Sequence, residues 1–66
     1  MIKNLTYRNL MAVIHKLERK GYSFTEAEPM ARRIFEEYQS SPLGVSIEER
    51  VNRIMSKEDW IREYGC

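Results

Sequence analysis

The amino-acid sequence predicts a small all-α protein, a bundle of three to four helices. Apolar residues recur at intervals of three and four along most of the chain, which is the period of an amphipathic helix. Ser or Thr followed three residues later by an acidic residue marks several helix starts. No segment alternates apolar and polar residues over a useful length, so no strand is predicted. We expect one domain over residues 1–66: a helical hairpin, a third helix packed across it and a short C-terminal helical turn.

The first predicted helix begins after Thr6, whose hydroxyl can cap its N-terminus. Lysines and arginines gather at residues 16–20, where cations suit the C-terminal end of the helix dipole. Gly21 follows as a stop signal. The expected apolar side of this helix comprises Tyr7, Leu10, Met11, Ile14 and Leu17.

The second predicted helix begins with a capping box, in which Thr25 caps the helix and Glu28 reaches back to it. Pro29 lies close to this start, where its missing N–H has a modest cost. Residues 39–45 are rich in Ser, Pro and Gly and predict a connection. The expected apolar stripe of the helix comprises Ala27, Met30, Ala31, Ile34, Phe35 and Tyr38.

Two more helix starts follow this connection. Ser46 and Glu49 have the spacing of a capping box and predict a short third helix. The expected apolar side of that helix comprises Ile47, Val51, Ile54 and Met55. Residues 56–59 (Ser-Lys-Glu-Asp) predict one last start, for a turn or two that carries Trp60, Ile61 and Tyr64.

Composition is typical of a folded cytoplasmic protein. Apolar residues make up 42% and charged residues 32% of the chain, and the formal net charge is +1. The net charge therefore gives no general reason to expect binding to nucleic acid or to an anionic membrane. The longest apolar run, Leu10 to Ile14, is far shorter than the ~20 residues that span a bilayer. We expect a cytoplasmic protein that does not contact a membrane.

No group of residues is typical of an active site. The single cysteine, Cys66, and the single histidine, His15, cannot complete a zinc site, and we expect His15 to be solvated or at the edge of the first helix's apolar side. The adjacent glutamates at 36–37 and 48–49 lie on polar helix faces, where nothing raises a carboxyl pKa. They are expected to form surface ion pairs such as Glu49 with Arg53. We expect no enzymatic activity, cofactor, metal or small-molecule ligand.

The chain has more large apolar side chains than a three-helix core needs. We expect Phe24 and Trp60 to cover the open end of the bundle. The candidate partner-binding residues are Tyr22, Leu43, Val45, Trp60 and Tyr64. Those of them that lie outside the core would anchor a partner. The sequence therefore favours a small protein-interaction module, an inhibitor or adaptor, whose partner is another protein or a second copy in a homodimer.

Charge is divided unevenly along the chain. Residues 1–22 hold five Lys or Arg against one Glu, a net charge of +4, and the remainder has a net charge of −3, which suits antiparallel pairing of two copies. A small nucleic-acid-binding accessory protein is the alternative, although Glu26 and Glu28 would repel phosphates from a second helix used as reader. Its candidate contact residues lie in the first helix and are Arg8, Lys16, Arg19 and Lys20. A structural subunit that completes a larger assembly is a further alternative.

The first helix, the loop Lys20–Ser23 and the helix beginning at Thr25 resemble the opening of a ubiquitin-associated domain. That family is a three-helix bundle with a hydrophobic-glycine-aromatic loop and a pair of large aliphatic residues near its end. Gly21-Tyr22 and Ile54-Met55 correspond to these features. However, Lys20 stands where the family has an apolar residue, and the second helix and its linker are longer than the family's. The resemblance implies a similar helical shape, and ubiquitin binding is not carried over.

Overall fold

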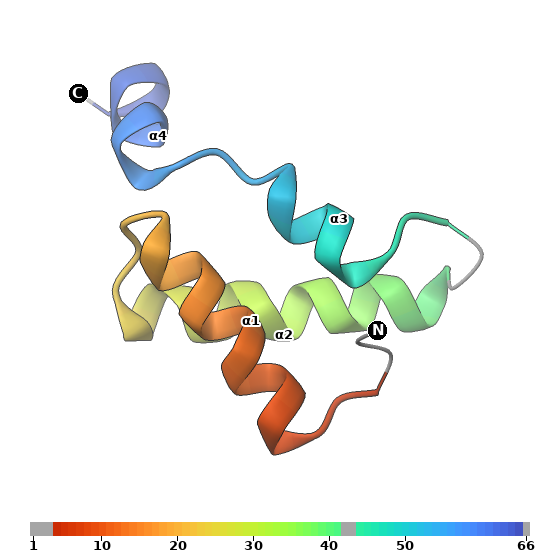
Figure 1. Cartoon of the computed structure of the whole chain (residues 1–66). Coiled ribbons are helices and arrows are strands. Elements are labelled where there is room, and N and C mark those ends of the chain that lie inside the picture. Colours follow the sequence, from red (N-terminus) through yellow and green to blue (C-terminus); the bar gives the residue numbers. More distant parts are fainter. Residues whose placement is uncertain (1–3, 42–43, 66) are drawn as a thin grey trace.

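A computed structural model describes residues 4–41 and 44–65 of the chain and contains four helices there (Figure 1). They are α1 (Tyr7–Arg19), α2 (Phe24–Ser40), α3 (Ile47–Asn52) and α4 (Lys57–Tyr64). α1 crosses α2 as the two arms of a hairpin, and α3 packs against both (Figure 1). No strand occurs in these residues. The all-α bundle predicted from the sequence is confirmed.

One hydrophobic cluster joins α1, α2 and α3, and Phe35 of α2 is its largest fully buried side chain. Each large aliphatic or aromatic side chain that is buried in such a cluster contributes about 1.5–3 kcal/mol. Over the described residues, no helix is long and apolar enough to cross a membrane. The buried residues are Leu10, Val13, Ile14, Leu17, Tyr22, Ala27, Ala31, Ile34, Phe35, Ile47 and Val51.

The apolar side of α1 differs from the prediction at two positions. Thr6 caps the helix as expected, since its hydroxyl accepts from the Asn9 N–H at 3.2 Å. Val13 is fully buried, although the sequence analysis did not place it on the apolar side. Tyr7 was predicted to be on that side, but it is 79% exposed. The buried stripe is centred between Val13 and Ile14, so Tyr7, in the first turn, falls at its edge.

α2 begins two residues before the predicted start, and the predicted Thr25–Glu28 capping box is wrong. The N-cap is Ser23, whose hydroxyl accepts from the Glu26 N–H while the Glu26 carboxylate accepts from the Ser23 N–H at 3.1 Å. The sequence contains two overlapping capping-box patterns, and the earlier one forms both reciprocal hydrogen bonds. The helix also runs on through Ser40, into the predicted connection. Pro29 lies inside the helix and omits one hydrogen bond near its start.

Ser46 and Ser56 cap α3 and α4, as predicted. α3 ends at Asn52, so Ile54 and Met55 lie in the connection to α4 and not on the apolar side of α3. α4 has no buried residue and does not pack against the other three helices within the described part of the chain. It lies instead beside the α1–α2 turn (Figure 1).

The α1–α2 turn and the start of α4 fit closely at Gly21. This residue has φ +101°, a backbone conformation that side chains rarely allow. A Cβ atom placed there would lie 3.0 Å from the Cβ of Lys57. The Lys57 N–H donates to the carbonyl of Lys20 at 2.7 Å, which fixes the start of α4 on the turn. A residue without a side chain is therefore needed at position 21 for both reasons.

Gly21→Ala should lower the free energy of unfolding by about 1–2 kcal/mol, because alanine is strained in the left-handed region. Urea unfolding followed by circular dichroism would measure this loss. Gly44→Ala is the matched control, since Gly44 does not have a positive φ and is exposed. Equal stability of the Gly21→Ala and Gly44→Ala variants would contradict the role given to the turn.

Candidate binding groove

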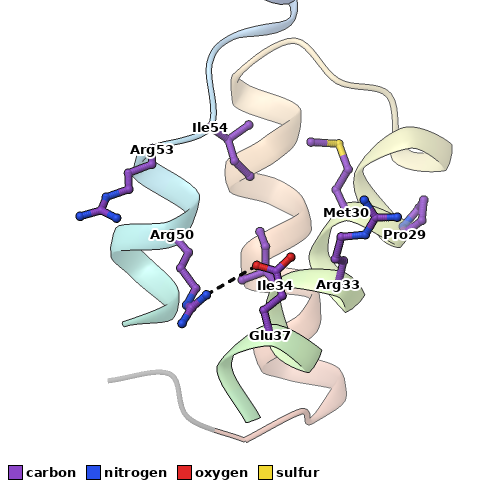
Figure 2. Close-up of a pocket in the computed structure, with 8 residues that line it drawn as sticks. All are labelled: Pro29, Met30, Arg33, Ile34, Glu37, Arg50, Arg53 and Ile54. Carbon is purple, nitrogen blue, oxygen red and sulfur yellow. Dashed lines mark ion pairs between the residues drawn. The ribbon is translucent and has the colours of Figure 1, made fainter. Parts of the chain in front are cut away.

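An open groove of about 600 Å³ lies between α2 and α3 (Figure 2). One wall comes from α2, and the other comes from α3 and the residues that follow it. The lining residues are Pro29, Met30, Arg33, Ile34, Glu37, Arg50, Arg53 and Ile54.

A second hollow, of about 720 Å³, continues this groove toward α4. The two share Met30, Arg53 and Ile54, so they form one depression along α2, which we call the α2–α4 groove. The second part is lined by Tyr22, Glu26, Met30, Arg53, Ile54, Met55, Lys57, Trp60 and Tyr64.

The groove has an apolar floor and a charged rim. Met30 and Ile54 are partly buried against the core and Ile34 is 6% exposed, so the floor is continuous with the core. The charged lining residues are Arg33, Arg50, Arg53, Lys57, Glu26 and Glu37, which is four cations against two carboxylates. The groove is therefore net positive, although residues 23–66 as a whole have a net charge of −3.

Most of these charges are paired across the groove or along a helix. Arg50 of α3 forms an ion pair with Glu37 of α2 at 3.6 Å (Figure 2). Arg53 pairs with Glu49 at 3.3 Å, as the sequence analysis predicted. Among the described residues, Arg33 has no carboxylate partner. It is the cation of the groove that an incoming carboxylate can bind without breaking an existing pair.

Lys57 attaches α4 to the rest of the molecule. Its ammonium forms an ion pair with Glu26 at the start of α2. The same ammonium lies 5.6 Å from the centre of the Tyr22 ring and 5.1 Å from that of the Trp60 ring. The Tyr22 hydroxyl donates to the carbonyl of Met55 at 2.9 Å. These few contacts, made by residues at the start of α4 and just before it, set where the helix lies.

The ion pair with Lys57 strongly favours the charged form of Glu26. The hydrogen bond from Lys57, followed by those from the Ser23 N–H and hydroxyl, lowers the pKa of Glu26 from 4.5 to about 2. Because the folded pKa is lowered, this attachment contributes fully above pH 4.5 and is lost as the pH falls toward 2.

The apolar side of α4 is only partly covered by the rest of the described chain. Trp60, Ile61 and Tyr64 have the spacing of one helix face and are 42%, 51% and 63% exposed. The rings of Trp60 and Tyr64 lie 5.8 Å apart, centre to centre, and both line the groove. An amphipathic helix whose apolar side faces solvent has spare surface for association.

The five candidate partner-binding residues have different positions in the structure. Trp60 and Tyr64 lie together at the end of the groove. Tyr22 is 7% exposed, so its ring belongs to the core and reaches the groove only at its floor. Val45 is half-buried and is not a lining residue, and Leu43 lies outside the described residues.

The expectation that Phe24 and Trp60 cover the end of the bundle is wrong, because they are 46% and 42% exposed. Tyr22 occupies the buried position beside the turn instead. Sequence reasoning also missed Arg33 and Arg53 as groove residues. The only sequence signal for the groove was that Met30 and Ile54 lie on predicted apolar sides. That signal does not distinguish the floor of a groove from a buried core.

The cations of α1 contrast with those of the rest of the chain. Arg8, Lys16, Arg19 and Lys20 have no carboxylate partner among the described residues. The one glutamate of α1 pairs with the exposed His15 at 2.9 Å. In the part of the chain that the structure describes, the lysines and arginines with a carboxylate partner lie in α2 to α4 and their connections: Arg32, Arg50, Arg53, Lys57 and Arg62. The described residues contain no group of three or more potential metal ligands.

Glu26→Gln should weaken the attachment of the Lys57 side chain at neutral pH without removing the α2 cap, since glutamine can still accept from the Ser23 N–H. Trp60 is the single tryptophan and lies under Lys57, so its fluorescence reports a change in this attachment. The wild-type emission should change between pH 4.5 and 2, and that of Glu26→Gln should change little. Glu28→Gln is the matched control on the same helix and should keep the wild-type transition; the same transition in all three proteins would refute the attachment.

No protein-family model, curated protein or solved structure matches this chain.

Proposed function

We propose that this chain is a non-enzymatic protein-interaction module that binds its partner along the α2–α4 groove and the exposed side of α4. The observation that supports this most directly is the position of Trp60 and Tyr64. They are 42% and 63% exposed, lie against each other and stand at the end of a groove with an apolar floor.

Aromatic and arginine side chains of this kind carry much of the binding energy in protein interfaces. Trp and Tyr each bury ~150–250 Å² when they are covered, and they lose little conformational freedom in doing so. Arg33 and Arg53 lie on the rim of the same groove. The groove thus combines an apolar centre with a polar edge, which is the usual anatomy of an interface.

The charges of the groove define the chemistry of the partner. Because four cations and two carboxylates line it, a segment with apolar side chains and flanking carboxylates fits best. The unpaired Arg33 would bind one such carboxylate, and Met30, Ile34 and Ile54 would contact the apolar side chains.

Replacing both Trp60 and Tyr64 by Ala should abolish recovery of a specific partner in affinity purification from the source cells, followed by mass spectrometry. Neither side chain belongs to the core of α1, α2 and α3, so that core should remain folded, and circular dichroism would check this. Tyr7→Ala is the matched control, because Tyr7 is an aromatic residue that is 79% exposed on α1, away from the groove. A partner that both variants recover equally would show that the surface is elsewhere.

A second candidate function, nucleic-acid binding through α1, is favoured by the unpaired cations of that helix. Arg8, Lys16 and Arg19 fall on the side opposite the buried stripe and are exposed. Arg8 and Arg19 are separated by about 16 Å along the helix axis. A duplex of that length carries about nine phosphates, so each of these three side chains and Lys20 can contact a phosphate.

Binding by four cations predicts a salt dependence that can be measured. The logarithm of the association constant for duplex DNA should fall with the logarithm of salt concentration with a slope of about −3.6. Each change of Arg8, Lys16 or Arg19 to Gln should reduce the slope by about one. Fluorescence anisotropy with a labelled duplex gives these slopes, and Arg62→Gln, which removes a paired cation, is the control. No measurable binding at low salt would exclude this function.

A further inference from the structure

We propose that the occupant of the α2–α4 groove is α4 of a second copy of this chain, so that two copies form a symmetric dimer by reciprocal insertion. This inference rests on the proposed function, because it names the partner of the same groove. Each copy contributes a groove and receives one helix.

The dimensions and chemistry of α4 fit the groove. α4 has 8 residues, a length of about 12 Å, while the groove follows α2 from Glu26 to Glu37, about 16 Å. The apolar side of α4 carries Trp60, Ile61 and Tyr64, which match the apolar floor. Its five charged residues are Lys57, Glu58, Asp59, Arg62 and Glu63, a net charge of −1 against a net positive groove.

One pair of charges singles out this arrangement. Arg33 is the one cation among the described residues beyond position 22 that has no carboxylate partner. On α4, Glu58 and Asp59 both pair with Arg62, whereas no described cation pairs with Glu63. Helical geometry places Glu63 at the edge of the apolar side of α4, beside Trp60. Insertion of α4 would therefore bring the unpaired Glu63 of one copy to the unpaired Arg33 of the other.

Reciprocal insertion also explains why α4 stands apart from its own bundle. The helix is attached through Lys57 and Met55, and about half of the surface of its apolar side chains is exposed. A second copy would cover that side and would offer its own α4 in return. Such a two-fold interface uses the same surface on both copies, so the assembly closes as a dimer.

Light scattering across a range of concentrations, with a reducing agent to prevent a disulfide at Cys66, tests the proposal. The wild type should be a dimer that dissociates on dilution. Arg33→Glu and Glu63→Arg should each raise the dissociation constant about tenfold, because each places like charges together. The double variant Arg33→Glu/Glu63→Arg should recover to within about threefold of the wild type, since the pair is restored with its charges exchanged.

Arg32→Glu is the matched control: it reverses the neighbouring arginine on α2, whose partner is Glu28, and should leave the dimer unchanged. Circular dichroism confirms that each variant is folded, and the milder Arg33→Gln should show a smaller effect in the same direction. A monomer at all concentrations, or a dimer insensitive to both reversals, overturns the reciprocal dimer. If such a monomer still recovers a partner that depends on Trp60 and Tyr64, the proposed function stands without this inference. If the Trp60/Tyr64 variant recovers the same partner as the wild type, the proposed function fails as well.

Discussion

The contacts of Lys57 determine where the last helix lies, and the candidate site depends on them. Lys57 joins Glu26 of α2, the ring of Tyr22 and the ring of Trp60, while its N–H bonds to the end of α1. The Cβ of Lys57 lies against Gly21, which is why the turn cannot carry a side chain there. Without these contacts α4 would have nothing to hold it, because none of its residues is buried. The α2–α4 groove would then lose its aromatic end.

The ion pairs distinguish α1, whose cations are mostly unpaired, from α2, α3 and α4, whose cations are mostly paired. In α2, α3 and α4 nearly every described cation has a carboxylate within reach, often three or four residues away on the same helix. Such exposed pairs contribute little to stability, but they leave few free charges. In α1 the cations have no such partner among the described residues, and the only glutamate of the helix pairs with His15. The groove and α1 thus offer different chemistry: an apolar floor with one arginine that lacks a described partner, and a helix with several such cations.

The fold was predictable because local signals and periodicity agree in each helix. Thr6, Ser46 and Ser56 cap helices as predicted. The errors arose where the local signal allows two readings. Ser23 and Thr25 both begin capping boxes. On α1, the apolar side could be drawn to include Tyr7 or to include Val13, and Val13 is the residue that is buried. The groove was not predictable in this way. The aromatic end of the groove depends on an ion pair between Glu26 and Lys57. These residues are 31 positions apart, and helical periodicity does not indicate a contact over that distance.

The two candidate surfaces are compatible because they lie on different parts of the bundle. The groove is lined by α2, α3, α4, the connection between α3 and α4, and Tyr22 of the α1–α2 turn, while the unpaired cations belong to α1 and its end. A chain of this length buries only ~60% of its unfolded surface, so covering Trp60, Ile61 and Tyr64 in a dimer would add stability that the bundle alone lacks. The four unpaired cations line neither part of the groove, so occupation of the groove does not require them.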